Sequence, residues 1–158
     1  MYEVPPIDVP NGFNIENAAR IRRATGMLTV GVGRINTAAL AEEILAEEKV
    51  DLVVMGRAQL ADPEFVNKAQ QGRVDEIVHC VGCNQGCYDG FCDVANRPHI
   101  TCMRNPMIGH EAEYELKKAE DPKKVWVIGG GVAGMEAAKV LQERGHEVTL
   151  FEASDALG

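Results

Sequence analysis

Five cysteines gather in the middle of this 158-residue chain, at Cys80, Cys83, Cys87, Cys92 and Cys102. The first three are spaced so that their thiolates can bind one side of a metal centre while a more distant cysteine binds the other side. This compact triplet favours a [4Fe–4S] cluster over a single zinc ion, because structural zinc sites usually combine two CxxC-type pairs. A zinc site and free thiols are the alternatives.

The fourth ligand of such a cluster has two candidates. We expect it to be Cys102, which lies farther along the chain than the triplet. Cys92 lies inside the gap between Cys87 and Cys102, and we interpret it as a buried or loop thiol. Cys92 in place of Cys102 is the alternative.

A glycine-rich motif near the C-terminal end predicts a dinucleotide site. Gly129, Gly131 and Gly134 form G-x-G-x-x-G between an expected strand at 125–128 and a helix that begins near Val132. The first glycine permits a tight turn, the second lets the backbone approach a pyrophosphate, and the third lets helix and strand pack closely. A glycine-rich turn in an unrelated strand–helix unit is the alternative.

An acidic residue follows this motif at the distance typical of adenosine recognition. The next expected strand, 147–151, ends at Glu152. A carboxylate there accepts hydrogen bonds from a ribose 2′-hydroxyl and repels a 2′-phosphate. We therefore expect the adenosine of FAD or NAD rather than that of NADP.

Two Gly-Arg pairs follow two expected strands in the first half of the chain. Gly33–Arg34 and Gly56–Arg57 stand at the C-terminal strand ends, where ligands gather in parallel β/α arrays. Glycine N–H groups and guanidinium forks both suit an oxyanion, so the pairs indicate a phosphate cradle. Turns with solvated arginines are the alternative.

The elements before residue 74 are expected to alternate between helix and strand. Apolar runs predict strands at 27–32 and 51–55, each buried on both faces as in a parallel sheet. Helical patterns occupy 14–26, 37–49 and 61–72, with N-caps at Asn14, Thr37 and Asp62 and a C-terminal Gly26. Residues 74–124 have neither period, so something other than an apolar core must order them.

Composition bounds the class of protein. The chain is 46% hydrophobic and 25% charged, which is typical of a globular protein. Its net charge of -8 argues against a nucleic-acid partner. No run approaches the roughly 20 apolar residues of a membrane span, and no signal peptide is visible. We expect a cytoplasmic protein without a membrane partner, with loop or surface histidines and a buried Trp126.

Five segments taken together resemble one family: VGRIN, DLVVMGRAQLADPEF, CVGCNQGC, CMRNP and VWVIGGGVAGMEAA. They resemble the iron–sulfur flavoenzymes related to Old Yellow Enzyme, which include 2,4-dienoyl-CoA reductase, 2-enoate reductase and trimethylamine dehydrogenase. The resemblance covers nearly the whole chain. The gap between the third and fourth cysteines is longer than is usual in the family.

The resemblance implies an α/β fold in four parts. Residues 1–73 resemble the C-terminal part of an FMN-binding TIM (β/α)8 barrel, and 74–109 the [4Fe–4S] segment. A linker at 110–123 leads to 124–158, which resembles the start of a Rossmann-like FAD/NAD(P)-binding domain. Because a whole barrel needs about 250 residues, the resemblance implies a fragment.

The resemblance also assigns roles to the motifs. Gly33, Arg34, Gly56 and Arg57 match FMN-binding positions; Gly129, Gly131, Gly134 and Glu152 match the ADP-binding segment of FAD; Cys80, Cys83, Cys87 and Cys102 match the cluster ligands. The family's catalytic side chains precede Met1, so no catalytic residue is assigned here.

The implied activity is reduction of an activated C=C bond by NAD(P)H, with electrons passing from FAD through the cluster to FMN. Amine oxidation of the trimethylamine dehydrogenase type is the first alternative, and a non-enzymatic electron-transfer or zinc-binding module is the second. The implied partners are a small-molecule substrate and either a second copy of the chain or an electron-carrier protein.

Overall fold

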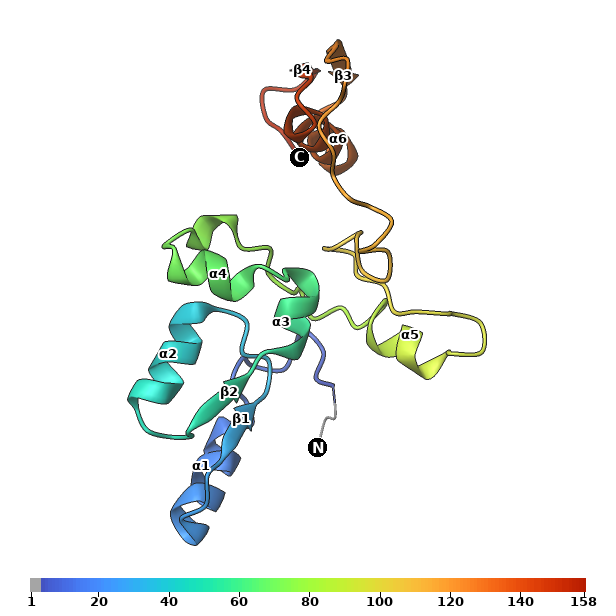
Figure 1. Ribbon diagram of the computed structural model, residues 1–158. Helices are drawn as coiled ribbons and strands as arrows, with labels where there is room; N and C mark the ends of the chain where they lie inside the picture. The colour runs from blue at the N-terminus through green and yellow to red at the C-terminus, as the bar shows by residue number, and fades with distance from the viewer. Residues whose placement is uncertain (1–3) are drawn as a thin grey trace. The chain divides into compact units, whose positions relative to one another are not determined.

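The structure, a computed structural model, describes residues 4–158 and forms two compact units. The first unit extends to His110, and the second spans Glu111–Gly158 (Figure 1). No helix within the described residues is long and apolar enough to cross a membrane. The first unit contains α1 (Ile15–Thr25), β1 (Val30–Val32), α2 (Ala38–Ala46), β2 (Leu52–Val54), α3 (Gly56–Ala61), α4 (Phe65–Gln70), the 3-10 helix η1 (Val74–Glu76) and α5 (Tyr88–Cys92).

Strands β1 and β2 pair in parallel, with Val30 opposite Leu52 and Val32 opposite Val54. Their carboxyl ends therefore lie side by side, as the β/α order predicts. The strand expected at 27–32 begins only at Val30, and Met27 and Leu28 are exposed.

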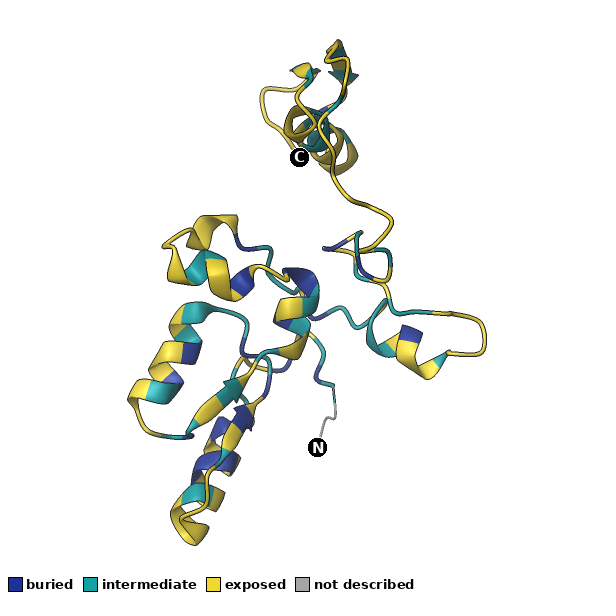
Figure 2. Cartoon of the chain, viewed as in Figure 1, coloured by how far each residue is buried: buried dark blue, intermediate teal, exposed yellow. Residues whose placement is uncertain are grey.

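One face of this two-stranded sheet packs on helices. Gly31 lies on that face, where a Cβ atom would come within 2.7 Å of Ile15 Cδ1, so glycine lets α1 approach the strand. The core beneath the sheet consists of Ile15, Ala18, Ile35, Ala41, Ile44 and Val50 (Figure 2). The opposite face is exposed at Val30, Val32, Leu52 and Val54, so the expectation of burial on both faces is wrong for the described residues.

Two of the predicted helix ends are confirmed. Gly26 adopts a left-handed conformation with φ of 65° and donates its N–H to Arg22, as a terminal glycine does. Thr37 caps α2 by accepting a hydrogen bond from the Leu40 N–H at 3.2 Å. Asn14 precedes α1, but its side chain accepts from the Asn17 amide instead of capping the backbone.

The region around Asp62 differs from the expectation. The chain turns directly from β2 into α3, Asp62 ends that helix, and α4 begins only at Phe65. The buried Asp62 carboxylate pairs with Lys68 at 2.7 Å and accepts the Val78 N–H at 2.8 Å. Burial opposes its ionisation, but the hydrogen bond from Lys68 and the backbone donors outweigh burial and keep the pKa of Asp62 below its ordinary value. Asp62 also accepts the Glu64 N–H at 3.0 Å, so it ties α3, the turn before α4 and the segment after η1 together, while Glu64 holds the N-cap position of α4.

The second unit is a strand–helix–strand unit made of β3 (Lys124–Ile128), α6 (Val132–Glu143) and β4 (Glu147–Phe151). The strands are parallel, with Lys124 opposite Glu147 and Ile128 opposite Phe151. These elements confirm the predicted strand, turn, helix and strand. Trp126 is 72% exposed and packs edge-to-face on Phe151, so the expectation that it is buried is wrong.

Candidate functional site

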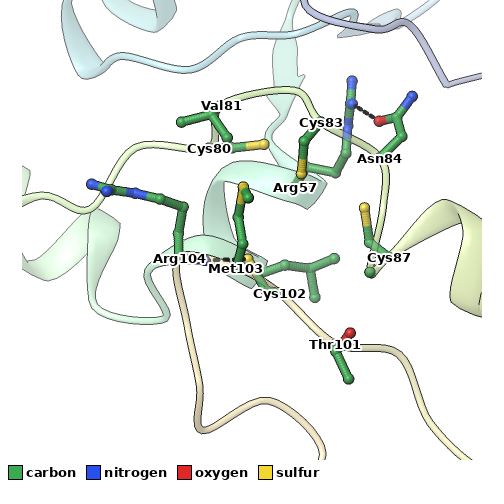
Figure 3. A pocket seen from close by; sticks show the side chains of 12 residues that line it. Arg57, Cys80, Val81, Cys83, Asn84, Cys87, Thr101, Cys102, Met103 and Arg104 are labelled. Carbon is green, nitrogen blue, oxygen red and sulfur yellow. Dashed lines mark hydrogen bonds between the residues drawn. The ribbon is translucent and has the colours of Figure 1, made fainter. Parts of the chain in front are cut away.

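Four of the five cysteines line one pocket in the first unit. Its lining includes Cys80, Cys83, Cys87 and Cys102, and its empty volume is about 330 Å³. Figure 3 shows these side chains entering from two stretches of chain, one carrying the triplet and the other carrying Cys102. Cys92 is exposed at the end of α5 and does not line this pocket. All five cysteines are free thiols.

The two stretches meet at Gly86 and Thr101. The Thr101 N–H donates to the Gly86 carbonyl at 3.0 Å, which joins the chain beside Cys87 to the chain beside Cys102. A Cβ atom on Gly86 would lie 2.3 Å from the Thr101 carbonyl oxygen, so this approach requires glycine. The junction therefore brings the remote cysteine to the triplet.

Backbone N–H groups donate to two of the sulfur atoms. The Gly82 N–H donates to Cys80 Sγ and the Arg104 N–H to Cys102 Sγ, both at 3.4 Å. Such N–H···S contacts favour thiolates and tune the potentials of iron–sulfur clusters. In the metal-free chain, burial raises the pKa of the Cys87 thiol.

The donor set of this pocket consists of four thiols. A single zinc ion brings its four donors within about 2.3 Å of one point. Within residues 4–158, no group of three or more His, Cys, Asp or Glu side chains could hold one metal ion. A cubane binds each thiolate through a different iron and so keeps the sulfurs farther apart. Four thiols lining one pocket are the donor set that a [4Fe–4S] cluster takes.

A second pocket lies at the carboxyl ends of β1 and β2. Gly33, Arg34, Gly56 and Arg57 all line it, and its empty volume is about 690 Å³. Gly33 has a φ of 143°, and a Cβ there would come within 3.1 Å of the Phe13 ring. The structure thus brings all four residues of the predicted phosphate cradle together.

Neither arginine of this pocket is simply solvated. Arg34 is half-buried and donates from Nη1 to the Ile7 carbonyl at 2.7 Å and to the Val9 carbonyl. Arg57 is half-buried and donates from Nη1 to Asn84 Oδ1. Arg57 also lines the cysteine pocket, so one guanidinium borders both pockets.

In the second unit, the predicted glycine turn joins β3 to α6. A Cβ on Gly134 would lie 1.9 Å from the Gly129 carbonyl oxygen, whereas one on Gly131 would meet nothing within 4 Å. Gly129 has a φ of 106°. The third glycine is therefore required for packing, and the second leaves open space beside the backbone.

Glu152 closes the same turn from the end of β4. Its Oε2 atom accepts the Gly130 N–H at 2.6 Å, and its Oε1 atom accepts the N–H groups of Ala153 and Ser154. The backbone donors of Ser154 and Gly130 lower the pKa of Glu152 to about 2. The carboxylate is therefore ionised at neutral pH.

The low pKa of Glu152 predicts a pH dependence for the second unit. Because the pKa of Glu152 in the folded chain lies below the ordinary glutamate value of 4.5, the stabilisation is present above pH 4.5 and is lost as pH falls towards about 2. Trp126, the sole tryptophan, reports unfolding of this unit by fluorescence. In the natural chain, we expect the urea midpoint of the second unit to fall as pH is lowered from 4.5 towards about 2. In Glu152→Gln, we expect the midpoint to be lower at pH 4.5 and to vary less with pH. Glu147→Gln, which removes an exposed carboxylate of β4, should keep the natural profile, and an equal profile in Glu152→Gln would refute the assignment.

Gly134→Ala tests the packing of the turn. The added Cβ must displace a backbone carbonyl, and overpacking of this kind costs about 1–3 kcal/mol or more. We expect the Trp126 unfolding midpoint to fall accordingly, while Gly131→Ala stays near the natural value. Equal midpoints for the two variants would contradict the packing argument.

Sequence reasoning missed polar residues that border the cysteine pocket. Asn84 lies inside the triplet, has a φ of 61° and donates to the Val4 carbonyl as well as accepting from Arg57. Its signal was an asparagine next to a cysteine in a turn, a position where left-handed backbone is tolerated. Arg104 and Asn36 were also missed.

The histidines contact different neighbours. His79 is half-buried against Phe65, while His99 and His110 contact each other edge-to-face at 4.6 Å. His146 lies in the second unit, where its Nδ1 atom accepts the Lys123 N–H.

A strand-end pocket bordered by two arginines, a pocket lined by four cysteines and a glycine turn with an ionised carboxylate are features typical of nucleotide-binding redox proteins. Residues 9–76 match the NADH:flavin oxidoreductase / NADH oxidase family, and residues 124–158 match the pyridine nucleotide-disulphide oxidoreductase family. The chain therefore contains stretches that match two oxidoreductase families, in the order expected from the resemblance to the NADH:flavin oxidoreductases related to Old Yellow Enzyme.

Similar proteins are much longer than this chain. A metal reductase of Desulforamulus reducens is 43% identical over 99% of the chain and 23% of that protein. A solved 2-naphthoyl-CoA reductase complex matches with a TM-score of 0.88 at 32% identity, covering 99% of this chain and 24% of that one. Histamine dehydrogenase from Rhizobium sp. 4-9 matches with a TM-score of 0.85 at 29% identity, covering 98% and 23%. The chain thus spans about a quarter of the length of these relatives.

Proposed function

We propose that this chain carries the cofactor-binding part of an NAD(P)H-dependent oxidoreductase that contains FMN, FAD and a [4Fe–4S] cluster. The observation that carries the proposal is the convergence of Cys80, Cys83, Cys87 and Cys102 on one pocket. In this proposal these four residues are the cluster ligands, and Cys92 is not.

The strand-end pocket is the proposed FMN phosphate site. Gly56 leaves open space beside its backbone, Gly33 lines the same pocket, and Arg34 and Arg57 supply positive charge at the carboxyl ends of β1 and β2. Parallel β/α units bind ligands at this end, and the FMN-dependent family match over residues 9–76 supports the same placement. Residues 4–73 then correspond to the C-terminal part of a TIM barrel, whose interior would cover the exposed face of β1 and β2.

The second unit is the proposed start of a Rossmann-like domain for FAD. Gly129, Gly131 and Gly134 provide the turn beneath a pyrophosphate, and the ionised Glu152 suits a ribose 2′-hydroxyl. The pyridine nucleotide-disulphide oxidoreductase match over residues 124–158 supports this role.

When bound, the flavins supply hydride transfer and the cluster supplies single-electron transfer between them. The residues of this chain bind and orient those groups, and no side chain in it is proposed to act on substrate. Reduction of an activated C=C bond is the proposed reaction, supported by the likeness to 2-naphthoyl-CoA reductase. Amine oxidation is the second candidate, favoured by the likeness to histamine dehydrogenase.

Anaerobic reconstitution of the full chain with iron and sulfide tests the proposal. We expect about four irons and four acid-labile sulfides per chain, with broad visible absorption. Retention of zinc without sulfide would overturn the cluster and support a structural metal site instead.

A further inference from the structure

The loop between β1 and α2 holds the first cysteine of the pocket through Asn36. The Asn36 Nδ2 atom donates to the Cys80 carbonyl at 2.8 Å, and its Oδ1 atom accepts the Cys80 N–H at 3.2 Å. His79 Nδ1 contacts the Asn36 carbonyl at 2.8 Å. The side chain of Asn36 thus binds Cys80 and its backbone carbonyl contacts His79, two consecutive residues that follow Asn36 by more than forty positions in the sequence.

An asparagine suits this task chemically. Its planar amide offers one donor and one acceptor, which match the carbonyl and N–H of a single residue. Its own backbone is anchored, because the preceding Ile35 is 3% exposed in the core and Thr37 caps α2. Because Asn36 is anchored, its hydrogen bonds fix the backbone of Cys80 relative to the end of β1.

We propose that Asn36 is a positioning residue, which fixes Cys80 in the cysteine pocket relative to the strand end that carries Arg34. This inference rests on the proposed function, because it assigns Cys80 to a cluster. Partners that orient a metal ligand narrow its motion before the metal binds, and their loss typically lowers metal affinity about 10–100-fold.

Two variants of the full chain separate positioning from general stability. Asn36→Leu has nearly the same shape and no polar atoms, while Asn17→Leu is a matched control at an exposed position on α1. In the metal-free chain, iodoacetamide labelling followed by peptide mass spectrometry gives the rate at each cysteine separately. We expect Asn36→Leu to raise the rate at Cys80 at least about threefold, the scale of a lost hydrogen bond, with Cys102 unchanged.

The same variants are then loaded with iron and sulfide under anaerobic conditions. We expect Asn36→Leu to lose iron to a chelator about tenfold faster than the natural chain and Asn17→Leu. The electron paramagnetic resonance spectrum of the reduced cluster should also change, which a loss of global stability would not produce.

Each outcome decides between the inferences. Unchanged labelling at Cys80, or equal acceleration at Cys80 and Cys102, would overturn the positioning role even if the natural chain assembles a cluster. If the natural chain fails to assemble a cluster, the proposed function fails, and selective acceleration at Cys80 would still support the positioning of that residue.

Discussion

Replacing Cys102 with serine is expected to abolish stable cluster binding, whereas replacing Cys92 with serine is expected to leave it intact. Cys102 lines the pocket with the triplet, and its sulfur accepts the Arg104 N–H. Cys92 is exposed and lies outside that lining. A hydroxyl is a poorer ligand for iron than a thiolate, because soft sulfur donors select iron–sulfur clusters.

The measurement is iron and acid-labile sulfide per chain after anaerobic reconstitution and gel filtration. We expect about four irons for the natural chain and for Cys92→Ser, and at least about a tenfold loss of retained iron for Cys102→Ser, since even indirect ligand partners cost that much. The Cys92 variant is the matched control, because it makes the same atomic change within the same segment. Loss of the cluster in Cys92→Ser with retention in Cys102→Ser would reverse the assignment of the fourth ligand.

Part of the cysteine pocket could be predicted from the spacing of the cysteines in the sequence. The triplet is a local feature, so its convergence follows from sequence distance and was predictable. The preference for Cys102 over Cys92 followed from the need for a remote donor, and the structure brings Cys102 to the pocket. The hydrogen bond between Thr101 and Gly86 brings Cys102 to the pocket. It joins two irregular stretches, and no periodic pattern in the sequence predicts such a contact.

Helix ends could be predicted from the sequence where a local residue satisfies the helix terminus by itself. Thr37 and Gly26 mark helix ends because a hydroxyl cap and a left-handed glycine satisfy the helix termini directly. Helix α3 was missed because Gly56–Arg57 resembles a turn at a strand end, and Asp62 looked like a cap although Lys68 and Val78 use its carboxylate. Contacts with residues elsewhere in the fold determine where α3 lies and what Asp62 binds, and the sequence pattern does not show these contacts.

The cysteine pocket and the strand-end pocket share Arg57 in their linings. Arg57 leaves the end of β2, borders the strand-end pocket and binds Asn84 inside the cysteine triplet. Asn36 leaves the end of β1 and binds Cys80. Asn36, in the loop after β1, and Arg57, at the start of α3, therefore both bind the cysteine segment, so the short sheet sets the position of both proposed cofactor sites.

The junction that closes the cysteine pocket predicts a large effect for Gly86→Ala. The new methyl group would lie 2.3 Å from the Thr101 carbonyl oxygen and 2.6 Å from its carbonyl carbon, both backbone atoms that cannot rotate away. The two stretches must then separate, and the hydrogen bond from Thr101 N–H to the Gly86 carbonyl is lost with that movement. Because Cys87 and Cys102 flank this junction, we expect retained iron to fall at least about tenfold after reconstitution.

Gly90→Ala is the matched control for this effect. Gly90 lies in α5 of the same segment, and its added methyl group would meet Ile100 Cα at 3.4 Å, an ordinary contact distance. We expect it to retain about four irons per chain, and both variants to keep the natural Trp126 unfolding midpoint, because that residue reports on the second unit. If Gly86→Ala retained as much iron as Gly90→Ala, the remote cysteine would not depend on this junction, and the path by which Cys102 reaches the pocket would have to be sought in the contacts of Asn105, whose buried amide donates to the Leu60 carbonyl.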